Sequence, residues 1–446
     1  MASELLTGWA RTSPSAAEVL RPSSADEVVD ILGAAGRRGV IARGLGRGYG
    51  DCAQNAGGRV IDMTAVAGRL DLDPDTGLAT VGGGRSIDEV IRAFLARGWF
   101  VPVTPGTRQV TMGGAVAADV HGKNHHRDGS LTAHVSGLRL ATPVGVEELS
   151  AGDDLFDATA GGMGLTGVVL EVDLQMTPVQ SAYMAVDTRR TTDLDETMAL
   201  MAADDHRYSV AWIDCLSTGR RMGRSVITSG EHARTDQLPP GLRSDPLRFR
   251  TSGPVPSPPW APSGLLNRAS IAAFNEAWFR HAPRQESGRI QGLGGFFHPL
   301  DGVRGWNRLY GARGFLQYQL VVPFGEEATL RRVIERLSSG RCPSFLGVLK
   351  TFGPAGAGHL SFPCAGWTLA LDVPVGPSML GPLLDAVDGE VAGAGGRVYL
   401  AKDSRLRPEL VEAMYPRLEE WRVVRDKVDP DRVLCSDLAR RLGLLE

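Results

Sequence analysis

One short segment holds most of the side chains that could do chemistry. Residues 119–126 read Asp-Val-His-Gly-Lys-Asn-His-His, which brings three imidazoles and an amine together. Imidazoles are common metal ligands, but no carboxylate or thiol cluster completes a ligand set, and His125 and His126 would point apart on a strand. We therefore predict no metal site. The pattern favours an active-site role for His121 near a reducible ring, with a satisfied structural histidine as the alternative.

Three glycine-rich segments indicate a large ligand: Arg43–Asp51, Pro105–Gly114 and Gly161–Gly167. The first is similar to a dinucleotide-binding fingerprint. However, its glycines run on to Gly58 and then into a strand with no amphipathic helix between, so we reject a Rossmann arrangement. Consecutive N–H groups in such a loop still form a phosphate-binding nest, and the alternative is a plain tight turn. Because turns alone explain three such loops poorly, we predict a nucleotide cofactor that touches all of them.

A fourth segment carries reactive groups without a motif of its own. Ala401-Lys402-Asp403-Ser404-Arg405 follows a predicted strand at Gly396–Leu400. A polar turn of this kind is typical of a solvated loop, and the local pattern alone places Lys402 in one.

The elements around these segments differ between the two halves of the chain. In the first half, capping boxes at Ser24–Glu27 and Ser86–Glu89 begin helices, the first of which is expected to end near Gly36 or Gly39. Short apolar strands alternate with them at residues 40–42, 60–63, 78–81 and 168–172. The alternation favours an α/β or α+β domain.

The second half has longer strands whose side chains alternate between two faces. This pattern predicts a mainly antiparallel sheet with covering helices. Strands are expected at 208–214, 315–322 and 367–373, and helices at 326–337 and 380–391. Residues 238–264 are rich in Pro, Ser and Gly, which is typical of a mobile surface loop; the alternative is a lid or a membrane-facing segment over the pocket.

Length and composition exclude several classes of protein. A chain of 446 residues predicts two packed domains. Lys and Arg number 48 against 51 Asp and Glu, and no basic stripe indicates a nucleic-acid partner. The five scattered cysteines predict free thiols in a reducing, cytoplasmic compartment. We find no signal peptide and no apolar run of about 18 residues, which leaves a peripheral membrane contact open.

Taken together, these segments closely resemble the decaprenylphosphoryl-β-D-ribose 2′-oxidase family of the vanillyl-alcohol-oxidase-like flavoproteins. The resemblance spans essentially the whole chain and rests on residues 6–9, 42–51, 105–111, 119–126, 315–319, 401–405 and 436–441. It implies an α+β, two-domain PCMH-type FAD-binding fold with an inserted antiparallel-sheet substrate domain. The implied boundaries are 1–178 for the FAD-binding domain, 179–394 for the substrate domain and 395–446 for a segment that returns to the first.

The resemblance also implies non-covalent FAD. Many relatives attach FAD through a histidine in the first glycine loop, and Arg47, which cannot form that bond, stands at the corresponding place. The residues implied to contact FAD are Arg43, Gly44, Leu45, Gly46, Arg47, Gly48, Tyr49, Gly50, Asp51, Asn55, Gly106, Thr111, Met112, Gly113, Gly114, His121, Gly122, Lys123, Asn124, Val168 and Tyr399.

The implied reaction oxidises the 2′-hydroxyl of a polyprenylphosphoryl-β-D-ribose, the first half of an epimerisation that supplies an arabinose donor for cell-wall synthesis. Lys402 matches the family's essential lysine. It either acts as the base, with its pKa lowered by desolvation, or stays charged and holds the sugar or flavin, while His121 orients the ring or the substrate. The implied catalytic set is Lys402, His121, Lys123, Gln319, Tyr310 and Tyr49, and the pocket set is Trp212, Gln317, Gln319, Lys350, Phe352, Thr368 and Ala370.

The pocket departs from the mycobacterial members, which carry Asn and Cys where this chain has Thr368 and Ala370, and Ser where it has Val210. Thiol-directed inhibitors are therefore not expected to react here. The smaller wall leaves an alternative substrate open, namely a soluble sugar, alditol or aldonolactone. A non-catalytic flavin protein is a third hypothesis, which Lys402 and His121 disfavour. The implied partners are the lipid-linked sugar phosphate, an NAD(P)H-dependent keto-reductase and a quinone or other electron acceptor. We expect docking at the cytoplasmic side of the membrane through residues 238–264.

Overall fold

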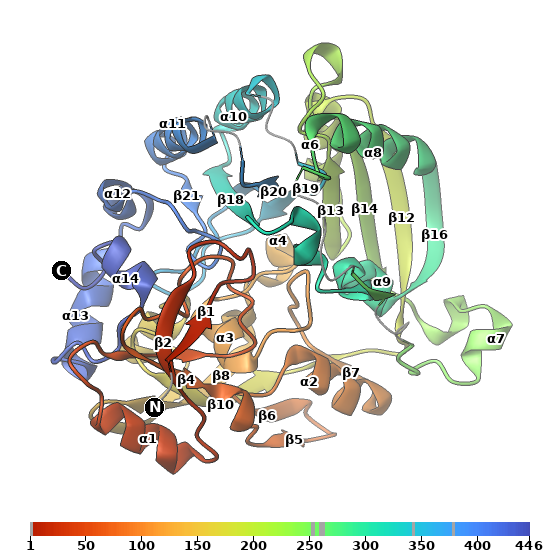
Figure 1. The fold of residues 1–446 in the computed structure, drawn as a ribbon. Helices are drawn as coiled ribbons and strands as arrows, with labels where there is room; N and C mark the ends of the chain where they lie inside the picture. Colours follow the sequence, from red (N-terminus) through yellow and green to blue (C-terminus); the bar gives the residue numbers. More distant parts are fainter. Residues whose placement is uncertain (1–2, 251–254, 258–263, 341–343, 377–379) are drawn as a thin grey trace.

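The computed structural model describes residues 3–250, 255–257, 264–340, 344–376 and 380–446. Figure 1 shows two parts side by side: the first 180 residues with the C-terminal segment, and a large sheet made by the residues between them. The fold is α+β, as predicted. Within the described ranges, no helix is both long and apolar enough to cross a membrane.

Two larger sheets and one short two-stranded sheet make the N-terminal part. The first has the order β1 (Ser3–Leu6), β2 (Ser15–Leu20), β4 (Arg59–Asp62), β3 (Val40–Arg43), and its last three strands are parallel. The second is antiparallel in the order β5 (Leu70–Leu72), β6 (Leu78–Gly82), β10 (Val168–Gln175), β8 (Val135–Thr142), β9 (Gly145–Ser150). β7 (Trp99–Phe100) pairs with β11 (Thr177–Pro178).

The helices of this part begin where the capping residues predict. Ser24 caps α1 (Ala25–Gly33) and Ser86 caps α2 (Ile87–Phe94), each by accepting from the N–H of the glutamate three residues later. The expected end of α1 near Gly36 or Gly39 is wrong, because the Ala34 N–H bonds to carbonyls within the helix and closes its last turn earlier. Two further helices are α3 (Met112–Ala117) and α5 (Asp154–Thr159).

A strand at His125 and His126 is also wrong. Both histidines begin the short helix α4 (His125–Asp128), because the N–H groups of Arg127 and Asp128 turn back to the Asn124 carbonyl. The two histidines are therefore neighbours in a helical turn, and their side chains do not alternate across a strand.

The second part is the predicted antiparallel sheet. Its strands lie in the order β16 (Gln285–Gly292), β12 (Tyr183–Thr191), β14 (Ser225–His232), β13 (Tyr208–Ile213), β19 (Gly347–Phe352), β20 (Gly366–Pro374), β18 (Phe315–Pro323), β21 (Arg397–Val398). Alternate side chains such as Ile213, Leu349 and Leu369 pack on one face against α6 (Leu194–Ala202), α10 (Glu327–Ser339) and α11 (Leu380–Gly393).

Further elements lie beside this sheet. They are α7 (Pro240–Arg243), α8 (Arg268–His281), α9 (Leu293–Phe297), β15 (Val255–Pro256) and β17 (Val303–Arg304). The segment 238–264 thus contains α7 and β15, but its residues 251–254 and 258–263 lie outside the described ranges, as does Cys342.

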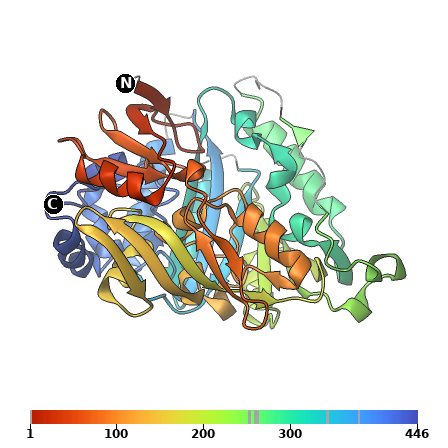
Figure 2. The same ribbon diagram turned by 90° about the horizontal axis from the view of Figure 1, so that it is seen from below.

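The C-terminal segment returns to the N-terminal part. It contains α12 (Val411–Met414), α13 (Leu418–Val428) and α14 (Asp437–Arg441). Arg441 pairs with Asp51 and Asp403, each at 2.8 Å, and Leu434 bridges to Val40 of β3. Figure 2 shows both chain ends on the same side of the molecule.

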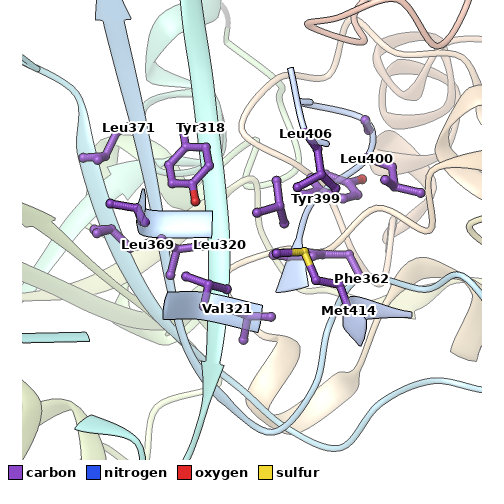
Figure 3. Close-up of a cluster of buried hydrophobic side chains, with 14 of the residues drawn as sticks. Tyr318, Leu320, Val321, Phe362, Leu369, Leu371, Tyr399, Leu400, Leu406 and Met414 are labelled. Carbon is purple, nitrogen blue, oxygen red and sulfur yellow. The ribbon is translucent and has the colours of Figure 1, made fainter. Parts of the chain in front are cut away.

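One apolar core joins this segment to the large sheet. Figure 3 draws part of this core: Tyr318 and Leu320 of β18, Leu369 and Leu371 of β20, and Tyr399, Leu400 and Leu406 of the chain after β21 belong to one buried cluster. β21 is shorter than the strand predicted at Gly396–Leu400, because the N–H groups of Lys402 and Asp403 bond to the Tyr399 carbonyl and form a turn. This turn places Lys402 at the end of a well-packed element rather than in a solvated loop.

Candidate active site

A cavity of about 710 Å³ lies between the glycine-rich loops and the large sheet. The first loop reaches it through Gly44–Tyr49, the second through Gly106 and Thr111, and the third through Met163–Gly167. Three segments that are far apart in sequence therefore meet at one cavity.

The glycine loops present backbone to the cavity. A Cβ on Gly44 would lie 2.1 Å from Thr111 Oγ1, so the first two loops approach each other as closely as only glycine permits. Gly46 has a φ of +64°, a left-handed conformation that favours glycine. Thr111 in turn accepts from the Gly114 N–H at 3.3 Å. A wall of this kind leaves its N–H groups available to a flat or phosphorylated ligand.

The opposite wall is one face of the large sheet, where every second side chain of a strand points into the cavity. β18, β20 and β19 supply a polar group of side chains, and the strands beyond them supply a more apolar group. The lining residues are Gln317, Gln319, Ala370, Asp372, Val348, Lys350, Val210, Trp212, Val226, Thr228, Thr188, Arg289 and Gln291.

Gln319 joins this wall to His121. Its buried amide nitrogen donates to Thr368 Oγ1 at 3.0 Å and lies 2.9 Å from His121 Nε2, while the Thr368 hydroxyl donates to a backbone carbonyl. Because both amide hydrogens are used as donors, His121 Nε2 is the acceptor and the ring proton lies on Nδ1. Burial, reinforced by the charges of Lys350 and Lys402, holds the pKa of His121 well below its usual range, so the ring is neutral.

Three half-buried lysines also line the cavity, and they differ in their contacts. Lys123 Nζ donates to the Phe296 carbonyl at 2.5 Å, and Lys350 Nζ donates to the Gly122 carbonyl at 3.4 Å. Desolvation lowers the pKa of each to about 7. In the described part of the chain, Lys402 Nζ has no hydrogen-bond acceptor within reach, and it lies 5.7 Å from the Tyr49 ring centroid. Its amino group is therefore available to a ligand.

Asp372 is the acidic partner of Lys402. It is 1% exposed, and it accepts from the Gln317 amide at 2.5 Å and from the Tyr310 hydroxyl at 3.3 Å. Burial lowers the pKa of Lys402 and the negative charge of Asp372 opposes that change. Burial likewise raises the pKa of Asp372, against the hydrogen bond from Gln317 and the charge of Lys402. The charge of each group therefore opposes the effect of burial on the pKa of the other.

Several polar atoms at the cavity lack a hydrogen-bond partner among the described residues. They are Arg47 Nε, His121 Nδ1, Gln317 Oε1 and Gln319 Oε1, all shielded from solvent. Buried polar atoms are normally bonded, so these atoms favour a polar ligand in the cavity. The glycine cradle and these groups together fit a flavin nucleotide with a polar substrate beside it.

Most of the residues proposed from the sequence line this cavity, but nine do not. Phe352 packs on His121 with ring centroids 4.8 Å apart, and Asp51 is bound by Arg441. Arg43 and Asn124 donate to backbone carbonyls of neighbouring loops. These residues support the wall from behind, and the full set is Arg43, Gly50, Asp51, Asn55, Met112, Asn124, Tyr310, Phe352 and Thr368.

Sequence reasoning missed Asp372, although it lies two residues after Ala370 on the same face of β20. The scarcity of lysine in the sequence was another signal that could have indicated the residues of the cavity. The chain has four lysines among its 48 basic side chains, and three of them line the cavity. The pKa of a lysine is readily lowered by desolvation, whereas arginine stays charged, so rare lysines in an arginine-rich chain mark sites where the charge can be adjusted. No local sequence pattern indicated that side chains of β12, β14 and β16 line the cavity.

Comparison with known proteins agrees with this geometry. Residues 16–150 match a family model described as an FAD binding domain, and residues 382–442 match one described as D-arabinono-1,4-lactone oxidase. Together with the cavity, the first match defines the class: the chain is an FAD-dependent oxidoreductase with a PCMH-type FAD-binding domain.

The full-length relatives narrow the class to a family. The chain is 45% identical to decaprenylphosphoryl-beta-D-ribose oxidase of Mycolicibacterium smegmatis, over 99% of this chain and 97% of the relative, and it belongs to the same family. An uncharacterised protein of Streptomyces coelicolor is 44% identical over 80% of this chain and 100% of its own length. L-gulono-1,4-lactone dehydrogenase of Mycobacterium tuberculosis is 25% identical over 96% of both chains. The predicted family, enzyme class and cofactor are confirmed.

Proposed function

We propose that this enzyme oxidises the 2′-hydroxyl of a polyprenylphosphoryl-β-D-ribose to the 2′-keto sugar. The observation that carries the proposal is the available amino group of Lys402, which faces the cavity beside Asp372 at the junction of the two walls. The substrate class rests on the full-length likeness to the mycobacterial oxidase.

The glycine loops are the part of the chain that we propose holds FAD. Gly44–Tyr49 and Thr111 offer backbone and hydroxyl groups, and Tyr399 and Val168 close the wall. The Arg47 guanidinium stacks on Trp9 at 3.7 Å, and an arginine cannot make the covalent flavin bond that a histidine makes, so the cofactor is bound non-covalently. When bound, FAD supplies the acceptor for the hydride that leaves the sugar carbon.

Lys402 removes the proton. Desolvation favours its neutral amine, which takes the hydroxyl proton while the hydride leaves C2′ with the electron pair of the C–H bond, and the carbon–oxygen double bond forms. The resulting ammonium group is stabilised by Asp372. Gln317 and Tyr310 hold that carboxylate in place through their hydrogen bonds.

His121 and Gln319 orient the sugar. The Nδ1–H of His121 is a donor and Gln319 Oε1 is an acceptor, and neither has a partner among the described residues. Lys123 and Lys350 provide the positive charge that suits a phosphodiester, and a bound anion favours their charged forms. The site thus offers a proton acceptor, sugar ligands and a phosphate counter-charge within one cavity.

The remaining assignments follow from the family. We place the FAD-binding domain at 1–178 with the returning segment 395–446, and the substrate domain at 179–394. The keto product requires a separate NAD(P)H-dependent reductase to complete an epimerisation, and the electrons require a quinone or another acceptor. A peripheral membrane contact brings the enzyme to its lipid-linked substrate.

An anaerobic flavin spectrum tests the proposal. We expect a short-chain polyprenylphosphoryl ribose to bleach the flavin band of the purified holoenzyme, and ribose or alditols at the same concentration to leave it unchanged. Bleaching by soluble polyols or aldonolactones alone would support the second candidate, a soluble-sugar or lactone oxidase. That candidate is favoured by the lactone-oxidase match over 382–442 and by the small side chain of Ala370.

A further inference from the structure

Exposed apolar side chains lie on α8 and just before its first turn. Leu265, Phe274 and Trp278 are 50%, 45% and 49% exposed, and the rings of Phe274 and Trp278 stack with centroids 6.1 Å apart. Four exposed alanines lie among them, Ala269, Ala272, Ala273 and Ala277, together with the exposed polar side chains of Asn267, Arg268 and Ser270. We call Leu265, Phe274 and Trp278 the α8 face. Adjacent exposed aromatics of this kind mark an interaction surface.

The opposite side of α8 is firmly held. Ile271 is 1% exposed, Asn275 donates to the buried Asp214 at 2.8 Å, and Glu276 pairs with Arg224 at 2.7 Å. Figure 1 shows the helix lying across the strands of the large sheet. The α8 face is therefore displayed by a fixed helix rather than by a loosely placed one.

The cavity reaches this helix. Trp278, His281 and Pro283 line the cavity, so the α8 face adjoins its opening. The lining runs from Gln319 on β18 to Arg289 on β16, which are six strand intervals apart, or roughly 29 Å at the usual spacing. A sugar phosphate occupies only the polar end near Lys402. The remaining length, beside Val210, Trp212 and Val226, suits an apolar chain.

The stretch of sequence that contains α8 is basic. Residues 243–313 hold ten arginines against four acidic residues, a balance of +6 in a chain whose net charge is −3. Arg268 and Arg280 lie on α8 itself, where Arg280 pairs with Glu276 at 2.5 Å, and Arg304 and Arg308 are exposed beside the cluster in which Leu266 packs. A second copy of this chain would bring the same positive charge against it, whereas an anionic surface would complement it.

We propose that the α8 face is a docking surface for an anionic lipid bilayer, and that the substrate's lipid chain passes from the bilayer into the cavity beside Trp278. Aromatic side chains prefer the membrane interface, and arginines nearby are attracted to anionic headgroups. The docking surface stands on the exposed side chains and the charge alone, whereas the passage of the lipid chain rests on the proposed function.

Vesicle sedimentation with the full-length holoenzyme tests the docking. We expect binding to phosphatidylglycerol vesicles that weakens with added salt, and weaker binding to phosphatidylcholine vesicles. Leu265→Ser with Phe274→Ser should lower the affinity for phosphatidylglycerol vesicles at least about tenfold, since each removes apolar area that the bilayer would bury. The matched control is Phe324→Ser with Val423→Ser, which removes side chains of 49% and 52% exposure elsewhere and should change the affinity less than about twofold. FAD content and thermal unfolding establish that both double variants are folded.

Three outcomes would overturn the docking proposal: no binding of the wild type to anionic vesicles, equal binding of the Leu265/Phe274 variant, or a wild-type dimer that this variant dissociates without any vesicle binding. Turnover separates this proposal from the proposed function. The Leu265/Phe274 variant should oxidise a short, water-soluble phosphoryl ribose normally and a vesicle-embedded long-chain substrate at least about fivefold more slowly. If anionic vesicles bind but neither substrate is oxidised, the docking surface stands and the proposed function falls.

Discussion

The two walls of the cavity are built on different principles. The glycine loops offer backbone, packed so closely that a Cβ on Gly44 would collide with Thr111, whereas the sheet offers side chains that alternate along seven strands. A backbone wall depends on few side chains and suits a cofactor that every family member shares. A side-chain wall can change one residue at a time, which suits a substrate that varies. The difference predicts that changes to the loops affect FAD binding, whereas changes to the sheet and the Lys402 turn affect the reaction.

The largest effect is expected from Lys402→Met. Loss of a general base usually costs a factor of 100 to 10,000, so we expect the rate of anaerobic flavin reduction to fall about 1,000-fold with unchanged FAD content. The control is Lys427→Met, which removes the exposed lysine of α13 and should leave the rate within about twofold. Loss of FAD from the Lys402 variant would contradict the prediction that changes at the Lys402 turn affect the reaction and not FAD binding.

A backbone change should act on the cofactor. Gly44→Ala forces Thr111 out of its place at the start of α3, and we expect the dissociation constant of FAD to rise at least about tenfold, because overpacking commonly costs about 1–3 kcal/mol. Fluorescence titration of apoenzyme with FAD measures it. Gly36→Ala is the control, since its Cβ would meet nothing within 4 Å. Unchanged FAD affinity in Gly44→Ala would contradict the role of this wall.

Asp372→Asn should shift the pH dependence of kcat/KM and lower the rate of flavin reduction less than Lys402→Met does. Asp372 raises the pKa of Lys402, so removing its charge lowers that pKa and yields the neutral base at lower pH. The acid limb of the kcat/KM profile should therefore shift to lower pH, by about one pH unit. If Lys402 instead acts as a charged hydrogen-bond donor, activity would fall as pH rises through the same pKa, and the variant would lose activity earlier on that limb.

The smallest effect is expected from Ala370→Cys. Ala370 is 9% exposed and lines the cavity, and a cysteine there adds a single sulfur atom. We expect kcat/KM to change less than about threefold while thiol-directed inhibitors of the family begin to inactivate the enzyme. Mass spectrometry of the intact chain would detect the adduct. Equal inactivation of the unmodified enzyme would show that another of its thiols reacts.

The two walls also differed in how far the sequence predicted them. The glycine loops are local motifs, and the reasoning that rejected a Rossmann helix after Arg43–Asp51 is confirmed by the strand–loop–strand arrangement of β3 and β4. The longer strands and the capping box at Ser86–Glu89 were predicted correctly because each depends on neighbouring residues. At the first predicted box only half is present: Ser24 caps α1, but the Glu27 carboxylate accepts from Ser23 rather than from the Ser24 N–H.

The sheet wall could be predicted only in part. The period of two that singles out Thr368 and Ala370 also leads to Asp372, but nothing local shows that a carboxylate there meets Lys402 from another element. Arg289 and Thr188 face the cavity because strands 100 residues apart in the chain are paired, which no short pattern reveals. His125 and His126 were misassigned to a strand because the turn set by Asn124 competes with the weak strand pattern around them.

Chemical rescue of Lys402→Ala tests the central claim most directly. The rate of anaerobic flavin reduction by a short-chain polyprenylphosphoryl ribose would be measured by stopped flow with increasing ethylamine, and with tetramethylammonium as the charged control. We predict that ethylamine restores the rate in proportion to its free-base concentration and that tetramethylammonium does not. Equal rescue by both cations, or a variant as fast as the wild type without added amine, would contradict the assignment of Lys402 as the proton acceptor.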